Sequence, residues 1–299
     1  MMPSTPAIGF VGFGEAAFHL AKGLREAGAG PLRAFDLHTH TPVRGEVIRR
    51  RACDTGTSLA VSNEELAQAC DVILSTVTSD QAALAAQQTA PFLSARHYYA
   101  DLNSVSPALK QSIAATIAPT GARFVEIAVM APVPPYGHRV PMLLGGESAA
   151  GLMELLTPFG MRMEIAARAV GVAAATKMFR SIVVKGLEAL VTECVLGAAR
   201  YDAAEHVFAS LAESYPGLDW NRLADYMVGR VVVHGERRAR EMEEVAETLR
   251  ALGIEPIMAE ATARRMEWSA SLGLKARFGG EAPRSYRVVV EAVEEAGRK

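Results

Sequence analysis

The stretch that decides the fold is Ala7-Ile8-Gly9-Phe10-Val11-Gly12-Phe13-Gly14-Glu15-Ala16-Ala17, near the start of the 299-residue chain. An apolar run typical of a buried strand leads into Gly12-x-Gly14-x-x-Ala17, and a helical pattern follows. The first glycine permits a tight turn, the second lets a pyrophosphate approach the backbone, and the small third residue lets the helix pack closely on the strand. The stretch therefore predicts a strand–turn–helix unit that binds a dinucleotide.

An acidic residue lies where such a unit needs one. Asp36 ends the next predicted strand, 24 residues after Gly12. A carboxylate there can accept hydrogen bonds from the adenosine ribose and repels the extra phosphate of NADP, which favours NAD. Arg33, His38 and Arg44 are close in sequence and leave NADP binding open, and a glycine turn beside a solvated aspartate is the plain alternative. The predicted cofactor-binding residues here are Gly12, Phe13, Gly14, Glu15, Ala16 and Asp36.

The first part of the chain alternates between strand and helix patterns. Apolar, β-rich runs predict strands at 7–11, 32–35, 72–77, 98–101, 124–129 and 142–144. Stretches rich in Ala, Leu, Glu and Gln predict helices at 15–27, 64–69, 81–90 and 108–118. Capping residues support two helix starts, at Ser62-Asn63-Glu64-Glu65 and at Ser106-Pro107. The alternation predicts an α/β fold, a doubly wound parallel sheet of the Rossmann type.

The second part of the chain is predicted to be all-helical. No proline interrupts the Ala- and Val-rich sequence from 171 to 199, which indicates one long helix. Further helices are predicted at 203–214, 219–233, 236–252 and 256–272. We therefore expect a dinucleotide-binding domain at 1–166 and an all-helical substrate and dimerisation domain at 167–299.

Composition excludes several classes of protein. Half of the residues are hydrophobic and 21% are charged, which excludes a disordered chain. A net charge of −2 gives no electrostatic reason to bind nucleic acid or an anionic membrane. Three distant cysteines and scattered histidines predict no disulfide framework and no metal site. No apolar run reaches the roughly 18 residues of a membrane span, and no signal peptide is evident. A soluble, cytoplasmic protein is expected.

With these motifs in place, the chain resembles the β-hydroxyacid dehydrogenase superfamily, which includes 6-phosphogluconate and 3-hydroxyisobutyrate dehydrogenases. The resemblance covers essentially the whole length. The helical half is similar to a less characterised phosphogluconate-dehydrogenase-like branch, on the evidence of Lys177-Met178-Phe179-Arg180-Ser181, Lys185-Gly186-Leu187-Glu188-Ala189-Leu190 and His234-Gly235-Glu236-Arg237-Arg238. The resemblance implies an NAD(P)-dependent dehydrogenase that acts on CH–OH groups of a small molecule, and a homodimer formed through the helical domain.

The resemblance makes Lys177 the catalytic residue. Apolar neighbours surround this lysine in sequence, and burial would lower the pKa of the amine toward that of a general base. From the residues alone, a solvated or snorkelling lysine is the simpler interpretation. Ser181 falls on the same helix face and replaces the asparagine that is usual in the family, so the substrate pose differs. Lys185 could attract an anionic substrate or be a plain helix-face charge.

Two strand-end segments resemble those beside the nicotinamide in the family. They contribute Val77 with Thr78, and Asn103 with Ser104, as predicted cofactor contacts. Taken alone, Asn103 is equally typical of a turn and Ser106 of a helix cap.

The substrate loop departs from the family. Met130 replaces the serine of the Ser-Gly-Gly motif, and Ala131-Pro132 replaces the two glycines. Proline removes an N–H donor and methionine offers an apolar contact, so a bulkier or less acidic substrate is expected. It would contact Met130 and Ala131 and be recognised by Tyr136, His138 or Arg139, unless the loop is only a rigid connection.

His234 and the arginines after it form a local basic cluster, which suits either a substrate anion or helix-surface salt bridges. The leading hypothesis is hydride transfer between a nicotinamide and a hydroxyacid-like or related alcohol substrate, with Lys177 as general acid/base, and decarboxylation after oxidation is possible. The alternatives are an imine or carbonyl reductase on the same scaffold, and an inactive dinucleotide-binding sensor.

Overall fold

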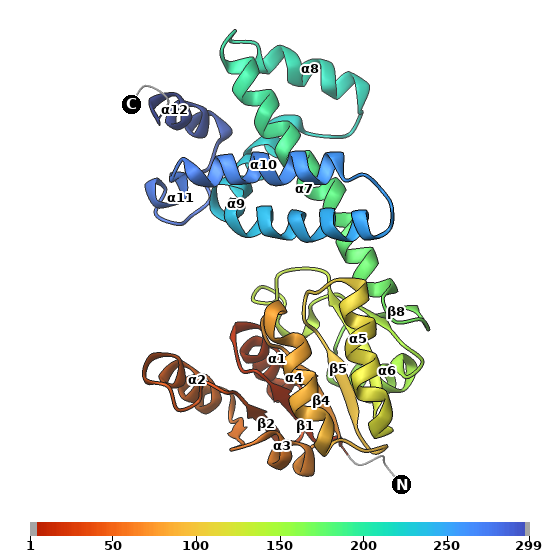
Figure 1. Cartoon of the computed structure of the whole chain (residues 1–299). Coiled ribbons are helices and arrows are strands. Elements are labelled where there is room, and N and C mark those ends of the chain that lie inside the picture. Colours follow the sequence, from red (N-terminus) through yellow and green to blue (C-terminus); the bar gives the residue numbers. More distant parts are fainter. Residues whose placement is uncertain (1–4, 297–299) are drawn as a thin grey trace. The chain divides into compact units, whose positions relative to one another are not determined.

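The structure is a computed structural model that describes residues 5–296. The chain forms two compact units, Met1–Lys177 and Met178–Lys299, and each is described here by itself (Figure 1). The division falls inside the long helix α7 (Val172–Ala199), so the first turn of this helix belongs to the first unit. The sequence patterns placed the change from α/β to all-α before this helix, at 166/167.

Within residues 5–296, eight strands of the first unit form one sheet in the order β3-β2-β1-β4-β5-β6-β7-β8. The pairs from β3 to β6 are parallel, β7 is antiparallel to β6, and β8 is parallel to β7. The doubly wound, mostly parallel sheet is therefore confirmed. The strands are β1 (Ile8–Val11), β2 (Leu32–Phe35), β3 (Ser58–Leu59), β4 (Val72–Ser75), β5 (Tyr98–Asp101), β6 (Arg123–Val129), β7 (Met142–Gly145) and β8 (Met163–Ala167).

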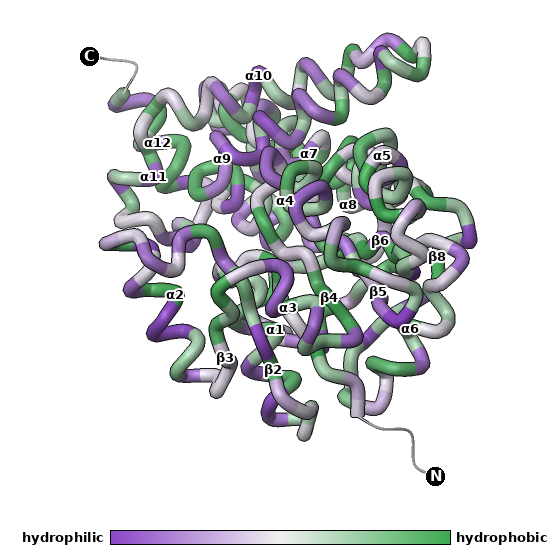
Figure 2. Tube along the Cα trace, turned by 60° about the horizontal axis from the view of Figure 1, so that its bottom comes forward, coloured by the Kyte–Doolittle hydropathy of each residue, from purple (hydrophilic) through white to green (hydrophobic). Residues whose placement is uncertain are grey.

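Two hydrophobic cores cover the two faces of this sheet. One core joins it to α1, α2 and α6, and the other joins it to α3, α4 and α5. Figure 2 shows the hydrophobic residues along β4 and the hydrophilic ones along α2, at the outside of the unit. The helices are α1 (Glu15–Glu26), α2 (Pro42–Thr55), α3 (Asn63–Ala69), α4 (Ala82–Thr89), α5 (Pro107–Ile117) and α6 (Ala149–Leu156).

The two predicted helix starts are confirmed in atomic detail. Ser62 Oγ accepts from the backbone N–H of Glu65 (3.1 Å), and the Glu65 carboxylate accepts from the N–H of Val61 (2.8 Å). Ser106 Oγ likewise accepts from the N–H of Leu109, and Pro107 is the first residue of α5. These side chains satisfy N–H groups that lack a partner inside the helix.

The second unit contains the rest of α7 and five more helices in its described part. The expected break near residue 234 is wrong, because α9 continues through Gly235. A Cβ on Gly235 would lie 2.9 Å from the Met266 carbonyl oxygen, so this glycine allows α10 to pack closely and does not end a helix. The five helices are α8 (Ala204–Ser214), α9 (Trp220–Ala251), α10 (Ile257–Ser271), α11 (Leu274–Arg277) and α12 (Tyr286–Ala296).

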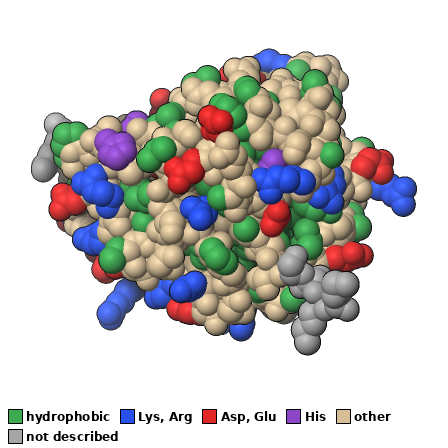
Figure 3. All heavy atoms as spheres, turned by 90° about the horizontal axis from the view of Figure 1, so that it is seen from below, with side chains coloured by type: hydrophobic (Ala, Val, Ile, Leu, Met, Phe, Trp, Pro, Cys, Tyr) green, Lys and Arg blue, Asp and Glu red, His purple; other side chains and the backbone are tan. Residues whose placement is uncertain are grey.

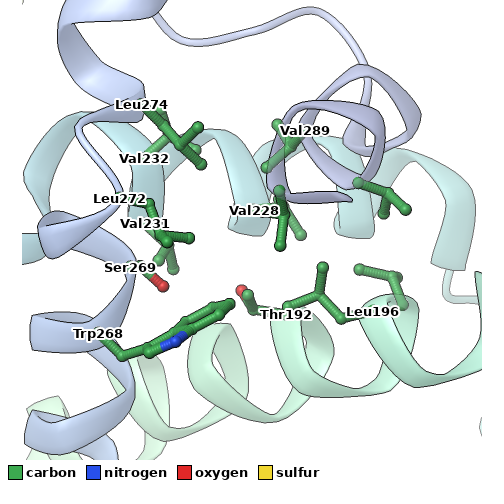
Figure 4. A pocket seen from close by; sticks show the side chains of 13 residues that line it. Thr192, Leu196, Val228, Val231, Val232, Trp268, Ser269, Leu272, Leu274 and Val289 are labelled. Atoms are coloured by element: carbon green, nitrogen blue, oxygen red, sulfur yellow. The ribbon is translucent and has the colours of Figure 1, made fainter. Parts of the chain in front are cut away.

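The interior of the second unit is apolar and closely packed. Side chains from α7, α9, α10 and α12 meet around a cavity of about 10 Å³ (Figure 4). Trp268 lies along one side of it, and the hydroxyls of Thr192 and Ser269 are the polar groups drawn at its wall. This volume holds at most one water, so the cavity is a packing feature and too small for a substrate.

The surface carries charges of both signs. On the face shown in Figure 3, Lys and Arg side chains are interspersed with Asp and Glu side chains and with apolar ones. This distribution agrees with the net charge of −2. In the described part of the chain, no helix has the length and apolar character that crossing a membrane requires.

A buried ion pair lies under the end of β5. Lys110 Nζ donates to Asp101 Oδ2 (3.0 Å) and to the Asp101 carbonyl oxygen (2.7 Å), and both side chains are 1% exposed. Burial lowers the pKa of Lys110, and the Asp101 carboxylate opposes that shift. The pair therefore fixes the start of α5 against the strand end from which the next loop leaves.

Replacing Lys110 by methionine is expected to lower the free energy of unfolding by about 3–5 kcal/mol, because Asp101 is left buried without its cation. Urea denaturation measures this. Arg250→Met is the matched control, since it breaks an ion pair with Glu260 whose side chains are 54% and 41% exposed. The control should cost no more than about 1 kcal/mol. Equal losses in the two variants would contradict a structural role for the buried pair.

Candidate active site

The turn between β1 and α1 has the geometry that the opening motif predicts. Gly12 adopts φ +83°, a conformation that favours glycine. Its N–H donates to the Phe35 carbonyl oxygen (2.8 Å), and its own carbonyl accepts from Thr76 Oγ1 (2.8 Å). A Cβ at this position would lie 2.8 Å from Val77 Cγ1. The turn is therefore tied to the ends of both neighbouring strands, β2 and β4.

Space remains open at the next glycine. Gly14 is the N-cap residue of α1, it provides no capping side chain, and a Cβ added to it would meet nothing within 4 Å. The first turn of a helix presents unpaired N–H groups and a partial positive charge. Glu15 is exposed and Ala16 packs partly against the core, so both contribute backbone N–H groups here. This region fits an anion the size of a pyrophosphate.

Asp36 is held firmly at the end of β2. Its Oδ2 accepts from the N–H of Phe13, and its Oδ1 accepts from the N–H of His38, both at 2.8 Å. Each carboxylate oxygen keeps a further lone pair, and the side chain is only partly buried, so it can also accept from a ribose hydroxyl. Arg44 reaches the His38 ring at 3.3 Å on the exposed side of the same loop.

The ends of β4 and β5 contribute two kinds of residue. Thr78 and Ser104 are exposed at the carboxyl edge of the sheet. Asn103 is buried, and its amide donates to Asp101 Oδ1 (2.5 Å) and to Ser75 Oγ (3.0 Å). Asn103 thus joins the two strand ends and fixes the loop that carries Ser104, which agrees with its alternative interpretation as a turn residue.

Lys177 reaches the same edge from α7. Its Nζ donates to Ser104 Oγ at 2.5 Å. The side chain is partly exposed, so a polar group holds the amine and its apolar sequence neighbours do not enclose it. Ser181 follows one helical turn later and is also partly exposed.

A buried carboxylate that we did not predict holds the start of this helix. Glu126 of β6 is 0% exposed, and it accepts from the N–H groups of Gly171 (2.6 Å), Ala173 (3.1 Å) and Ala174 (3.4 Å). The one signal in the sequence is a charged residue inside an otherwise apolar strand. A negative charge at a helix N-terminus is favoured by the helix dipole, which offsets part of the cost of burying it.

The loop after β6 has few free N–H groups. The N–H of Met130 donates to the Pro141 carbonyl oxygen (2.9 Å), and that of Tyr136 donates to the Val133 carbonyl oxygen (3.0 Å). Three prolines in the loop have no N–H, Ala131 is partly buried, and Tyr136 is 52% exposed. His138 is buried against α1, because a Cβ on Gly23 would lie 1.9 Å from its Nδ1. His138 therefore packs against α1.

The predicted site residues in the second unit have charged neighbours of their own. Lys185 Nζ is buried and donates to Glu241 at 2.7 Å, and desolvation lowers its pKa against the opposing effect of Glu241. His234 is half-buried, and desolvation together with Arg237 and other nearby cations lowers its pKa. Salt bridges engage the arginines of this cluster, in the pairs Arg237–Glu241, Arg238–Glu188 and Arg240–Glu236.

The geometry suits binding of an organic cofactor beside an amine. Across residues 5–296, no three His, Cys, Asp or Glu side chains gather as metal ligands do. The Gly12–Gly14 turn, Asp36, Thr78 and Ser104 all lie at the carboxyl ends of parallel strands, where an open α/β sheet binds ligands.

Comparison with known proteins agrees with this geometry. Residues 7–150 match the NAD binding domain of 6-phosphogluconate dehydrogenase, and residues 198–269 match a domain of unknown function, DUF1932. A conserved hypothetical protein from Sinorhizobium meliloti 1021 is 36% identical, with a TM-score of 0.84 over 98% of this chain and 97% of that one.

A second conserved protein of unknown function, described as structurally similar to 3-hydroxyacid dehydrogenases, is 31% identical, with a TM-score of 0.76 over 92% of this chain and 99% of that one. The 3-hydroxyisobutyrate dehydrogenase of Mycobacterium tuberculosis shares the fold at 15% identity, with a TM-score of 0.74 over 97% of this chain and 99% of that one. The chain belongs to the β-hydroxyacid dehydrogenase superfamily. Its NAD binding domain supports a nicotinamide cofactor and a dinucleotide-dependent oxidoreductase.

Replacing Gly14 by alanine is expected to weaken NADH binding by about 10-fold or more while leaving the Tm unchanged. The added methyl meets no protein atom, but it fills the space through which a pyrophosphate approaches the backbone. Titration of NADH fluorescence and a thermal melt measure the two quantities. Gly197→Ala is the matched control, because a Cβ there also meets nothing within 4 Å, at a helical position far along α7. Unchanged NADH affinity in Gly14→Ala would show that the nucleotide lies elsewhere.

Proposed function

We propose that this protein is an NAD-dependent dehydrogenase that oxidises the CH–OH group of a hydroxyacid-like or related alcohol substrate, with Lys177 as general acid/base. The observation that carries the proposal is the 2.5 Å hydrogen bond from Lys177 Nζ to Ser104 Oγ. It holds an amine at the carboxyl edge of the sheet that also carries the Gly12–Gly14 turn. Membership of a superfamily of dehydrogenases supports the same assignment.

In the proposed reaction, separate residues of this chain bind the cofactor and transfer the proton. Backbone N–H groups at Gly14 and the start of α1 bind the pyrophosphate, Asp36 accepts from the adenosine ribose, and Thr78 and Ser104 border the nicotinamide. When bound, the nicotinamide would supply the acceptor for the hydride that leaves the alcohol carbon. Lys177 in its neutral form takes the hydroxyl proton, and in the reverse direction its ammonium form returns a proton to the oxygen.

Ser104 orients this amine. One N–H of Lys177 is used in the bond to Ser104, which limits the directions in which the remaining lone pair or N–H can point. Because Ser104 is exposed, its hydroxyl can pass a proton on to solvent. The Ser181 hydroxyl then binds the substrate by donating or accepting a hydrogen bond.

The substrate differs from the small hydroxyacids of the family. A loop that binds a substrate carboxylate through its backbone needs N–H groups that are free to donate. In the loop from Met130 to Tyr136, most residues either donate their N–H within the protein or are prolines, which have none. We therefore propose a bulkier or less acidic substrate that contacts Met130, Ala131 and Tyr136. The same loop is the observation that favours the second candidate, reduction of an imine or another carbonyl compound, which needs no carboxylate grip.

We propose NAD as the cofactor, because Asp36 places a fixed negative charge where NADP carries its additional phosphate. Wild-type protein should bind NADH about 10-fold more tightly than NADPH, the ratio that a repulsion of about 1–2 kcal/mol produces. Asp36→Ser should remove most of this preference, and Arg44→Ala should weaken NADPH binding alone. Fluorescence titrations with the two cofactors check this, and equal affinities in the wild type would refute the preference.

Replacing Lys177 by alanine is expected to lower kcat by about 10²–10⁴-fold, the contribution of a general acid/base, while NADH affinity stays unchanged. The measurement is NADH formation with a panel of hydroxyacids and alcohols, and the reverse reaction with carbonyl compounds and imines. Lys22→Ala removes an exposed lysine from α1 and serves as the control.

Three outcomes separate the hypotheses. Turnover that survives in Lys177→Ala removes the assigned mechanism. Turnover restricted to carbonyl or imine reduction favours the second candidate. Tight NADH binding without turnover of any compound favours a dinucleotide-binding sensor.

A further inference from the structure

Two buried carboxylates lie side by side under the Lys177–Ser104 pair. Asp101 and Glu126 are register partners on the adjacent parallel strands β5 and β6, and both are 0% exposed. Two adjacent buried anions repel each other, so each needs its own positive partner. Asp101 and Glu126 have different hydrogen-bond partners in the structure. Those of Asp101 lie next to Ser104 and those of Glu126 lie at the start of the helix that carries Lys177, and Ser104 and Lys177 are joined by a hydrogen bond.

Asp101 supports the position of Ser104 in this Lys177–Ser104 hydrogen bond. It accepts from Lys110 Nζ at 3.0 Å, and its Oδ1 accepts from the backbone N–H (3.1 Å) and the side-chain amide of Asn103. Asn103 directly precedes Ser104 in the chain. The position of the Ser104 hydroxyl therefore depends on a buried and fully engaged carboxylate.

Glu126 supports the position of Lys177 by holding the start of its helix. Its carboxylate accepts three N–H groups from the first turn of α7, and the side chain fits against Gly145, where an added Cβ would lie 2.3 Å from Glu126 Oε1. Lys177 follows Gly171 by six residues, about 9 Å along the helix axis. Gln111 adds a further tie through a hydrogen bond to the Val170 carbonyl oxygen (3.1 Å).

We infer that Glu126 is a positioning residue for catalysis: through its carboxylate it fixes the first turn of α7 and so sets the Lys177 amine against Ser104. This inference rests on the proposed function of Lys177 and assigns Glu126 no contact with substrate or cofactor. The positive end of the α7 helix dipole stabilises the buried Glu126 carboxylate, as the Lys110 ammonium group stabilises the Asp101 carboxylate.

The first test is a double-mutant cycle between Glu126→Gln and Lys177→Ala. Glutamine keeps the shape of the side chain but loses the charge, and the NH2 group that replaces one carboxylate oxygen cannot accept an N–H. We expect Glu126→Gln to lower kcat by about 10–100-fold in the wild-type background, as a displaced catalytic group does, with KM and NADH affinity nearly unchanged. In the Lys177→Ala background the same substitution should change turnover less than about 2-fold, because the group that it positions is absent.

A purely structural Glu126 predicts a different result. Equal losses of kcat in both backgrounds, or a loss that appears in KM and NADH affinity, would overturn the inference. Glu164→Gln is the matched control, since it removes the same charge from an exposed position on β8 of the same sheet. Glu126→Asp restores the charge with a shorter reach, and its kcat should lie between those of Glu126→Gln and the wild type.

The second test needs no turnover. In the full-length protein without substrate, amide hydrogen exchange of Gly171, Ala173 and Ala174 should be about 10-fold or more faster in Glu126→Gln than in the wild type or Glu164→Gln, because an NH2 group replaces one acceptor oxygen and the remaining oxygen carries no charge. Unchanged exchange overturns the positioning role whatever the activity. If the wild type turns over no substrate, the proposed function fails, and the exchange rates alone decide whether Glu126 holds this turn.

Discussion

At the point where chemistry is expected, a hydrogen bond from Lys177 Nζ to Ser104 Oγ connects the long helix α7 to the loop after β5. A lysine side chain is long and flexible, so a single such bond defines a catalytic geometry only if both of its ends are fixed. Buried charge provides that fixation, with Asp101 and Lys110 under Ser104 and Glu126 under the first turn of α7. Removing one member of the Asp101–Lys110 pair leaves the other as an unpaired charge in the interior, and removing Glu126 leaves the N–H groups at the start of α7 without their acceptor.

Local signals were sufficient to predict the sheet and the nucleotide turn. The Gly12–Gly14 motif, Asp36 and the capping box at Ser62 each act through a few neighbouring residues, and the structure places them as expected. The helices α2 and α6 and the strands β3 and β8 were missed. β3 has only two residues, β8 is mostly exposed, and α2 is rich in arginine, so these three elements lack a clear apolar period. α6 is a mostly apolar stretch of eight residues, which periodicity alone does not distinguish from a strand.

Long-range contacts account for the remaining differences. The sequence pattern divided α9 into two helices, 219–233 and 236–252. Gly235 instead lies inside one continuous helix where α10 approaches closely, and nothing in the local sequence shows that neighbour. Glu126 has its N–H partners more than 40 residues away, so its role is visible only in three dimensions. For the same reason the sequence left open whether Lys177 is buried or reaches solvent, and the folded chain brings Ser104 to a partly exposed side chain. The homodimer implied by the family resemblance stays a prediction.

The account depends on where the nucleotide places its reactive ring, and a crystal structure of the protein with NAD⁺ bound tests this most directly. The account predicts the pyrophosphate against the backbone of Gly12–Gly14, the adenosine ribose on Asp36, and the nicotinamide beside Ser104, with its C4 facing a space that Lys177 Nζ borders. A nicotinamide directed away from Ser104, or an amine that has left this edge of the sheet, would contradict the proposed redox chemistry.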